Sequence, residues 1–222
     1  SFRMHDPDDM LFHMRSTYGG TYVWTNGVLE KLDGKVSDAI QSLVYPYWHP
    51  SGDYVAFSTN QTKQMFHMKD KNRIEVFDMS SDVLVYDVKN HRVVTDSLLF
   101  SKQAFETFPS FSPDGKTLYF SSSVAQKMPI DYKKVKYNIC SISFDAETGR
   151  FGTQVDTLFS VEQTGKTGTF PRVSPDGKFL AFTEADYGNF TIWHKEADLC
   201  LIDLKTKEIK SLDALNSLEA ES

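Results

Sequence analysis

The chain has 222 residues, a formal net charge of −6, and 17 phenylalanines within an aromatic content of 14%. An acidic balance argues against a dedicated nucleic-acid-binding protein, because such proteins carry basic patches. No apolar run approaches the roughly 18 residues of a membrane-spanning helix, so we expect no direct membrane span. The length is sufficient for a single all-β domain with a sizeable core.

The first predicted unit covers residues 6–34 and has the weakest pattern in the chain. Strands are predicted near residues 10–15 and 21–25, and a third strand is predicted over residues 28–32. Asn26-Gly27 separates the last two strands, and Asn-Gly is a strong signal for a tight hairpin turn because both residues tolerate positive φ. We interpret this unit as a degenerate copy of a repeat that is better preserved in the rest of the chain.

A motif then recurs three times at a nearly fixed period. It reads Tyr-Pro-Tyr-Trp-His-Pro-Ser-Gly-Asp from residue 45, Phe-Pro-Ser-Phe-Ser-Pro-Asp-Gly-Lys from residue 108, and Phe-Pro-Arg-Val-Ser-Pro-Asp-Gly-Lys from residue 170. The first prolines are residues 46, 109 and 171, which lie 63 and then 62 residues apart. A constant period of this kind indicates a repeat architecture.

Each copy of the motif predicts a β-hairpin. The aromatic-Pro segment is expected to be a short strand with proline as its first residue, where no ladder hydrogen bond is lost. Pro-Asp-Gly, or Pro-Ser-Gly in the first copy, is turn chemistry, and an apolar strand comes after it. A second hairpin is predicted further along each copy, with its first strand over residues 82–87, 138–144 or 198–203.

Four strands per period of about 60 residues predict the blades of a β-propeller, each somewhat longer than usual. We predict an all-β propeller of four-stranded antiparallel blades, of which about three and a half to four are present. The predicted blades cover approximately residues 6–34, 44–100, 107–160 and 169–212, and a linker or short helix is predicted over residues 213–222.

The repeat carries a family resemblance. The pattern x-Pro-x-aromatic-Ser-Pro-Asp-Gly-Lys followed by an apolar strand resembles the WD-like repeat of TolB-type β-propellers; the first copy departs from it at His49 and Ser51. The segments Asp-Pro-Asp-Asp-Met-Leu-Phe-His-Met-Arg from residue 6 and Gln-Met-Phe-His from residue 64 are similar to Bacteroidetes envelope proteins labelled cytochrome c biosynthesis or TolB-like.

The resemblance implies a periplasmic or outer-membrane-associated protein of the bacterial envelope. It also implies a six-bladed wheel, so we expect this chain to be part of a longer protein. Some of the similar proteins carry a Cys-x-x-Cys-His haem-attachment motif, which this sequence lacks, so haem is not carried over and no cofactor is expected.

The two cysteines, Cys140 and Cys200, occupy equivalent repeat positions, which Leu84 fills in the earlier copy. Equivalent positions in neighbouring blades point the same way around the ring. Sheets stacked about 10 Å apart then keep the sulfurs beyond bonding distance, since a disulfide needs Cα atoms within about 7 Å. We predict two buried free thiols.

The sequence gives little support for catalysis or metal binding. It has no Gly-x-Ser-x-Gly nucleophile elbow and no zinc-type His or Cys spacing. Gly165-Lys166-Thr167 lacks the earlier glycine of a phosphate loop and leads into a predicted strand. His-Met pairs at residues 13–14 and 67–68 could ligate a metal, but a strand and a loop explain them better. We therefore predict no catalytic residue and no metal ligand.

The excess length of each repeat lies in the connection between its second and third strands. These connections run over residues 59–81, 122–136 and 184–197, and all should emerge on one face of the wheel. Long loops are often functional, and aromatic residues with basic ones are typical of interfaces. The candidate binding residues are Phe66, His67, Lys69, Arg73, Tyr132, Lys133, Lys134, Tyr187, Phe190, Trp193 and His194.

Two functions remain open from the sequence. The first is a non-catalytic binding scaffold that recognises a protein or a glycan through the loop face. The alternative is the accessory propeller of a hydrolase, because the propeller repeats of prolyl oligopeptidase-like peptidases look similar. The sequence does not name the ligand, and it leaves the oligomeric state open.

Overall fold

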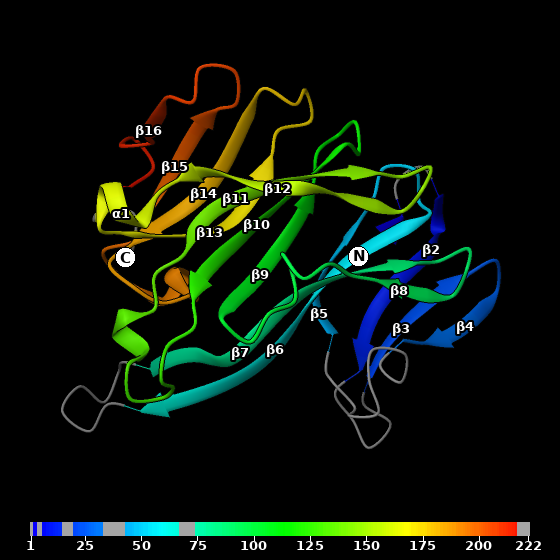
Figure 1. Ribbon diagram of the computed structural model, residues 1–222, viewed down its shortest axis with the longest axis horizontal. Helices are drawn as coiled ribbons and strands as arrows, with labels where there is room; N and C mark the ends of the chain where they lie inside the picture. The colour runs from blue at the N-terminus through cyan, green and yellow to red at the C-terminus, as the bar shows by residue number, and fades with distance from the viewer. Residues whose placement is uncertain (1, 4–5, 15–19, 33–42, 67–73, 217–222) are drawn as a thin grey trace.

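The computed structural model describes residues 2–3, 6–14, 20–32, 43–66 and 74–216, which fold into four antiparallel sheets of four strands each (Figure 1). The first sheet contains β1 (Phe2–Arg3), β2 (Asp6–Met14), β3 (Gly20–Thr25) and β4 (Val28–Lys31). The second contains β5 (Leu43–Trp48), β6 (Tyr54–Phe66), β7 (Ile74–Asp87) and β8 (Arg92–Val94). Strands that are consecutive in the chain pair with each other in both sheets.

The remaining two sheets repeat this order. The third contains β9 (Ala104–Phe111), β10 (Thr117–Val124), β11 (Asn138–Asp145) and β12 (Arg150–Phe159). The fourth contains β13 (Thr167–Val173), β14 (Phe179–Ala185), β15 (Asp198–Asp203) and β16 (Ile209–Ser211). The short helical segments described are η2 (Tyr132–Lys134), α1 (Val161–Thr164) and η3 (Thr191–Trp193). The prediction of an all-β fold of four-stranded antiparallel blades is confirmed.

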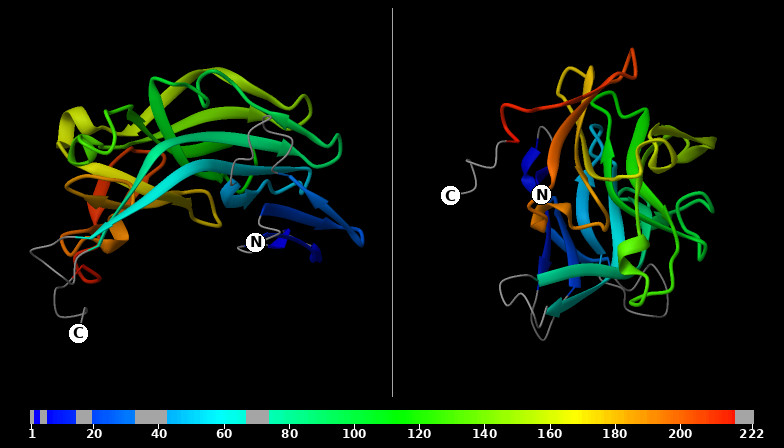
Figure 2. Two further views of the ribbon diagram at one scale, coloured as in Figure 1. Left: turned by 90° about the horizontal axis from the view of Figure 1, so that it is seen from below. Right: turned by 90° about the vertical axis from the view of Figure 1, so that its left-hand side faces the viewer.

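The sheets pack face to face around their first strands, as Figures 1 and 2 show. The first strands of the last three sheets (β5, β9 and β13) lie innermost, and β9 contacts both β5 and β13. Separate apolar clusters fill the spaces between the first and second sheets, the second and third, and the third and fourth. Within the described ranges, none of the helical segments has the length and apolarity needed to traverse a bilayer.

The aromatic-Pro motif forms a β-bulge, which corrects the expectation that its proline begins the strand. In β5, Val44 pairs with Ser58 and Tyr47 pairs with Ala56, so Tyr45 and Pro46 together oppose one residue. Register shifts occur at the same place in β9 and β13. A bulge leaves its extra residue without a ladder hydrogen bond, so a proline there removes nothing that the sheet needs.

The residue before each proline adopts a left-handed backbone. Tyr45, Phe108 and Phe170 have φ values of 53°, 55° and 56°. Their rings meet where the inner strands converge, with centroids 4.7 Å apart between Tyr45 and Phe108 and 3.9 Å apart between Phe108 and Phe170. Phe190 joins this group, which we call the hub cluster, at 6.2 Å from Phe108. The hub cluster therefore links three sheets at the molecule's centre.

The connection expected as a loop over residues 59–81 is mostly strand, which corrects the sequence prediction. β6 and β7 stay paired from Tyr54 opposite Asp87 to Phe66 opposite Ile74, with one irregularity between Asn60 and Thr62. Thr62, Val76 and Phe77 are residue types that favour strands, and the extended ladder satisfies backbone groups that a loop would leave to water.

Both cysteines are free and buried, as predicted. Cys140 packs between the second and third sheets, whereas Cys200 packs between the third and fourth. Each lies at the same place in its sheet, because Cys140 pairs with Phe120 and Cys200 pairs with the equivalent Phe182. The repeat therefore keeps the two sulfurs in separate clusters.

We expect a thiol titration in denaturant, without reductant, to find two free sulfhydryls per chain, because the repeat holds both sulfurs apart. A monomer that yields no free sulfhydryl would contradict this arrangement.

His49 replaces the serine of the other two motifs and connects the second and third sheets. The Ser51 backbone N–H donates to His49 Nδ1 at 3.1 Å, whereas the hydroxyls of Ser112 and Ser174 accept from the backbone of Thr117 and Phe179 at the start of the next strand. Because Nδ1 accepts, the ring proton lies on Nε2 and is donated to the Gly115 carbonyl at 2.9 Å. The imidazole is thus held neutral between two turns.

Acid should weaken this contact. Burial lowers the pKa of His49, against the opposing effects of the Gly115 carbonyl, Asp53 and Asp114. Below about pH 6.5, the unfolded chain then binds more protons at His49 than the folded chain does. The contribution of His49 to the free energy of unfolding therefore decreases as the pH is lowered. We expect the difference in unfolding free energy between the native chain and His49→Ser to shrink from about pH 7.5 to about pH 5 in urea titrations. A difference that grows on acidification would contradict the assigned tautomer.

Candidate binding site on the loop face

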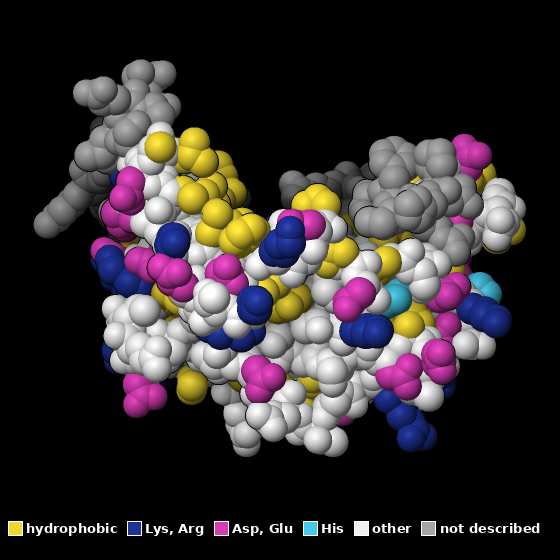
Figure 3. All heavy atoms as spheres, turned by 90° about the horizontal axis from the view of Figure 1, so that it is seen from above, with side chains coloured by type: hydrophobic (Ala, Val, Ile, Leu, Met, Phe, Trp, Pro, Cys, Tyr) yellow, Lys and Arg dark blue, Asp and Glu magenta, His cyan; other side chains and the backbone are white. Residues whose placement is uncertain are grey.

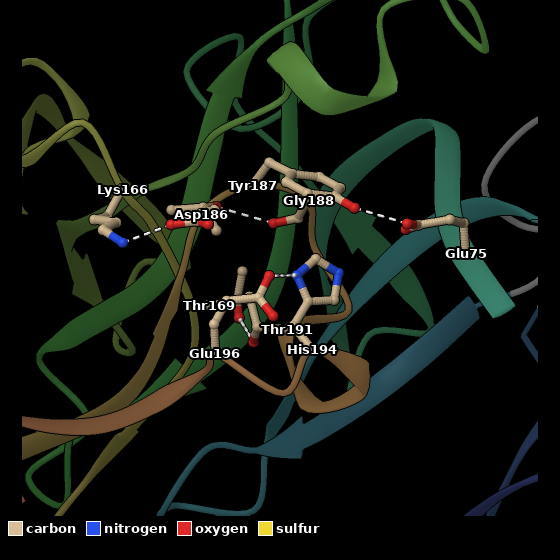
Figure 4. A network of polar contacts seen from close by, with 10 residues as sticks. Glu75, Lys166, Thr169, Asp186, Tyr187, Gly188, Thr191, His194 and Glu196 are labelled. Carbon is tan, nitrogen blue, oxygen red and sulfur yellow. Dashed lines mark hydrogen bonds and ion pairs between the residues drawn. The ribbon is translucent and has the colours of Figure 1, made fainter. Parts of the chain in front are cut away.

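The connections between the second and third strands of three sheets meet at one face of the molecule. This loop face lies at the lower left of Figure 1, where the far end of the β6–β7 hairpin, η2 and η3 come together. The β14–β15 loop, which carries η3, crosses from the fourth sheet as far as the second. Its Tyr187 hydroxyl donates to Glu75 Oε1 of β7 at 2.7 Å (Figure 4).

Aromatic rings from all three connections form the loop-face cluster, which consists of Phe77, Tyr132, Tyr187 and His194. Tyr132 stacks on Phe77 with centroids 5.6 Å apart and contacts the edge of Tyr187 at 5.9 Å. The ring of His194 lies 4.8 Å from that of Tyr187. Phe77 is buried, whereas both tyrosines are half-buried, so part of the aromatic surface faces solvent.

Charged groups border this cluster. Lys133 Nζ lies 5.8 Å from the ring centre of Tyr132 and 5.6 Å from that of Tyr187, within the range of cation–π attraction. His194 Nδ1 lies 3.5 Å from Glu196 Oε1. Lys166 of the fourth sheet pairs with Asp186 at the start of the β14–β15 loop, at 2.5 Å (Figure 4). The rim therefore offers both signs of charge around an aromatic centre.

A buried carboxylate anchors the loop beneath the rings. Asp78 of β7 is 2% exposed and accepts hydrogen bonds from Asn60 Nδ2 and Thr62 Oγ1, both at 2.6 Å. Asn189 of the β14–β15 loop also donates to Asp78. Burial raises the pKa of Asp78 to about 6, although the bonds from Thr62 and Asn60 oppose the rise. The loop is fixed to the second sheet by these bonds.

The structure brings four of the candidate residues together, namely Tyr132, Lys133, Tyr187 and His194. Phe190 lies apart from them in the hub cluster, and Lys134 pairs with Asp131 at 2.9 Å. Trp193 is 62% exposed on η3, beside Ile192 at 64%. Phe66 ends β6, but its side chain lies outside the described residues, as do His67, Lys69 and Arg73.

Sequence reasoning missed Glu75, Phe77, Asp78 and Asn189. The first three lie in a segment that was predicted as a loop, so the sequence did not indicate which way their side chains point. Strand propensity is the signal that could have found them, since the neighbouring Ile74, Val76 and Phe77 are β-branched or aromatic. Nothing in the sequence pairs Asn189 with Asp78, which is 111 residues away.

The described residues contain no group of three or more His, Cys, Asp or Glu side chains that could hold a metal ion. The Gly-Lys-Thr segment enters β13 as predicted, and Gly165 ends α1 with a left-handed φ of 71°. It is therefore built as a helix end followed by a strand, unlike a phosphate-binding loop, which opens a helix.

Another buried acid, Glu106 of β9, lies between the second and third sheets. It is 2% exposed, and its Oε2 atom has no hydrogen-bond partner in the part of the chain that the structure describes. Burial and the nearby charge of Asp82 raise the pKa of Glu106 to about 8. The carboxyl group is therefore mostly protonated near neutral pH.

Glu106→Gln should stabilise the protein increasingly as pH rises. Between about pH 4.5 and about pH 8 the unfolded glutamate is ionised while the folded one keeps its proton, so native stability falls across that window. The amide removes this loss, and we expect a gain of about 1 kcal/mol in urea titrations near pH 8. The exposed Glu162→Gln is the matched control and should show no such trend. A gain that is equal at all pH values would contradict the assignment.

Comparison with known proteins identifies the fold. No family model matches the sequence, and no curated protein matches it. Among solved structures, a puromycin-hydrolysing peptidase of Mycobacterium tuberculosis superposes with a TM-score of 0.56 at 15% identity, over 94% of this chain and 30% of that one. A prolyl endopeptidase gives 0.54 at 16% identity, over 87% of this chain and 26% of that one.

The tricorn protease gives a TM-score of 0.52 at 11% identity, over 91% of this chain and 17% of that one. The chain thus spans less than a third of each of these proteins. Identities this low establish a shared fold and nothing about activity. The chain has the fold of the propeller domains of such proteins.

Proposed function

We propose that this chain is a non-catalytic β-propeller scaffold of the bacterial cell envelope, which recognises a protein or glycan partner through its loop face. The observation that carries the proposal is the convergence of connections from three sheets on one partly exposed aromatic cluster. The apolar clusters that fill the spaces between neighbouring sheets lie elsewhere. The β10–β11 connection also buries Val135 against Phe105 of β9, which fixes that connection to its own sheet.

The chemistry of the face supports recognition. Half-buried tyrosines with a lysine alongside are typical of binding surfaces, because they combine apolar area with polar groups at little entropic cost. Ile192 and Trp193 add exposed apolar side chains on η3, a 3-10 turn whose first residue, Thr191, is buried. The Asp78 bonds hold the β14–β15 loop in place, so little ordering is required when a partner binds.

A second candidate function is the accessory propeller of a peptidase. It is favoured by the superposition on peptidase structures, of which this chain covers 17 to 30%. Labelling of the full-length protein with a fluorophosphonate separates the two functions, since that probe reacts with an activated serine nucleophile. Labelling would favour the peptidase, and absence of labelling would favour the scaffold.

Truncation of the exposed aromatic residues should weaken binding. We expect Trp193→Ala and Tyr187→Ala to reduce affinity by about 1 kcal/mol or more if either residue is an anchor, because buried aromatic anchors dominate interface energy. Binding is measured on arrays of envelope glycans and on displayed peptide libraries, with circular dichroism to confirm that the sheets are intact. Tyr187→Phe, which removes the hydroxyl that donates to Glu75 but keeps the ring, separates loop positioning from ring contact.

Lys116→Ala and Lys178→Ala are the controls, because both residues lie in the Asp-Gly-Lys turns of the opposite face. These variants should bind normally. If they lose binding while the Trp193 and Tyr187 variants retain it, the partner binds on the other side of the wheel.

A further inference from the structure

Two connections of the loop face expose large apolar side chains. They are the β10–β11 connection (residues 125–137) and the β14–β15 loop (residues 186–197). Ile130 is 71% exposed on the first connection, whereas Ile192 and Trp193 are 64% and 62% exposed on the second. Because removal of apolar area from water is favourable, these side chains are suited to burial by a partner.

Hydrogen bonds hold these two connections together. The Gly188 N–H of the β14–β15 loop donates to the Val135 carbonyl of the β10–β11 connection at 2.8 Å. Thr167, at the start of β13, links the same two segments. Its hydroxyl accepts from the Tyr137 N–H and donates to the Gly188 carbonyl, both at 2.9 Å. Val135 is also buried against Phe105 of β9. The exposed apolar side chains therefore lie on a base that is fixed to the sheets.

The same connections carry more positive than negative charge. Together they contain five lysines and three acidic residues, although the whole chain has a net charge of −6. Each acidic residue already has a basic or imidazole partner, in the pairs Asp131 with Lys134, Asp186 with Lys166, and Glu196 with His194. Lys127, Lys133 and Lys195 are exposed and pair with no carboxylate of the described residues. The charge of these three lysines therefore complements an acidic partner.

The turn side of the molecule has a different distribution of charge. In Figure 3, which looks onto the turns of the third and fourth sheets, basic and acidic groups are interspersed. Lys178 of one such turn pairs with Asp176 of the same turn at 3.1 Å. Charge complementarity to an acidic partner is therefore a property of the loop face rather than of the whole surface.

The chemistry of the exposed groups favours a peptide over a glycan. Tyr132 already stacks on Phe77, and Lys133 lies over the rings of both Tyr132 and Tyr187, so these rings are partly covered. The branched aliphatic side chain of Ile130 requires apolar area on the partner, whereas a sugar chain presents mostly hydroxyl groups. An acidic peptide supplies both the apolar area and the carboxylates.

We propose that the loop face binds an acidic peptide segment of a partner protein, one that carries at least one large apolar side chain. The three lysines attract the carboxylates of this segment, and Ile130, Ile192 and Trp193 bury its apolar side chain. The inference rests on the proposed function, because it names the partner class of the same face. Attraction between exposed charges is modest for each pair and is screened by salt, so binding depends on several lysines and on ionic strength.

A displayed library of random peptides tests the proposal without prior choice of a ligand. The full-length protein is panned against the library, and we expect the enriched peptides to combine Asp or Glu with Leu, Ile, Phe or Trp. Lys133→Glu reverses one charge beside the tyrosines, so the peptides that this variant enriches should contain fewer acidic residues. Enrichment of neutral or basic peptides by the native protein would overturn the inference.

Affinity for the most enriched peptide is then measured by isothermal titration calorimetry. We expect Lys133→Gln and Lys195→Gln each to weaken binding about twofold to fivefold at low salt, and to have less effect at high salt. Ile192→Ser should weaken binding about fivefold or more at either salt concentration, because it removes buried apolar area. Circular dichroism confirms that the sheets of each variant are intact.

Lys116→Gln is the matched control, since it removes one exposed positive charge from the turn side, and it should bind the peptide as the native protein does. An equal loss in Lys116→Gln would show that the peptide is attracted by overall charge and would overturn the inference.

Two further measurements separate this inference from the proposed function. Binding to a glycan array without enrichment of any peptide would overturn the acidic-peptide partner and leave the scaffold function in place. Sedimentation with phosphatidylglycerol vesicles that is lost in Trp193→Ser, again without peptide enrichment, would identify a membrane surface as the occupant and overturn both. Absence of any peptide or glycan ligand would also overturn both.

Discussion

The aromatic-Pro bulge is the constraint on which the rest of the structure depends. A left-handed backbone at a non-glycine residue costs about 1 to 2 kcal/mol, and this chain adopts it at Tyr45, Phe108 and Phe170. Packing of the three rings at the hub offsets this cost, since aromatic pairs contribute beyond the area they bury. The same bulge shifts the register of the remainder of each inner strand by one residue relative to its neighbour.

The bulge register also decides which residues lie between sheets. Tyr54 and Val83 of the second sheet are buried against the third, whereas the equivalent Phe179 and Leu199 of the fourth sheet are 40% and 36% exposed. Hydrophobic side chains are also gathered along one flank of Figure 3. The apolar character of the fourth sheet's outer face is therefore a property of the repeat, and it is weak evidence for a separate recognition surface.

The repeat period predicted the sheets and the thiols because both result from local chemistry repeated at a fixed spacing. The length of the β6–β7 hairpin was missed, since polar residues such as Asn60 and Thr62 suggested a loop while Asp78 satisfied them across the ladder. The convergence of Tyr132 and Tyr187 was anticipated from topology alone. The partners Glu75 and Asn189 were not, because a contact between residues more than 100 positions apart leaves no local pattern.

The two faces differ in how they are held, which bears on how each can bind. On the loop face, the β14–β15 loop is bonded to the buried carboxylate of Asp78 through Asn189, so displacement of this loop removes a donor from Asp78. Beyond the hub cluster, Arg172 is fixed by main-chain carbonyls of the inner strands, which cannot move without changing the bulge register. The loop face can therefore adapt to a partner by shifts of its exposed side chains, whereas the inner strands are held by main-chain contacts.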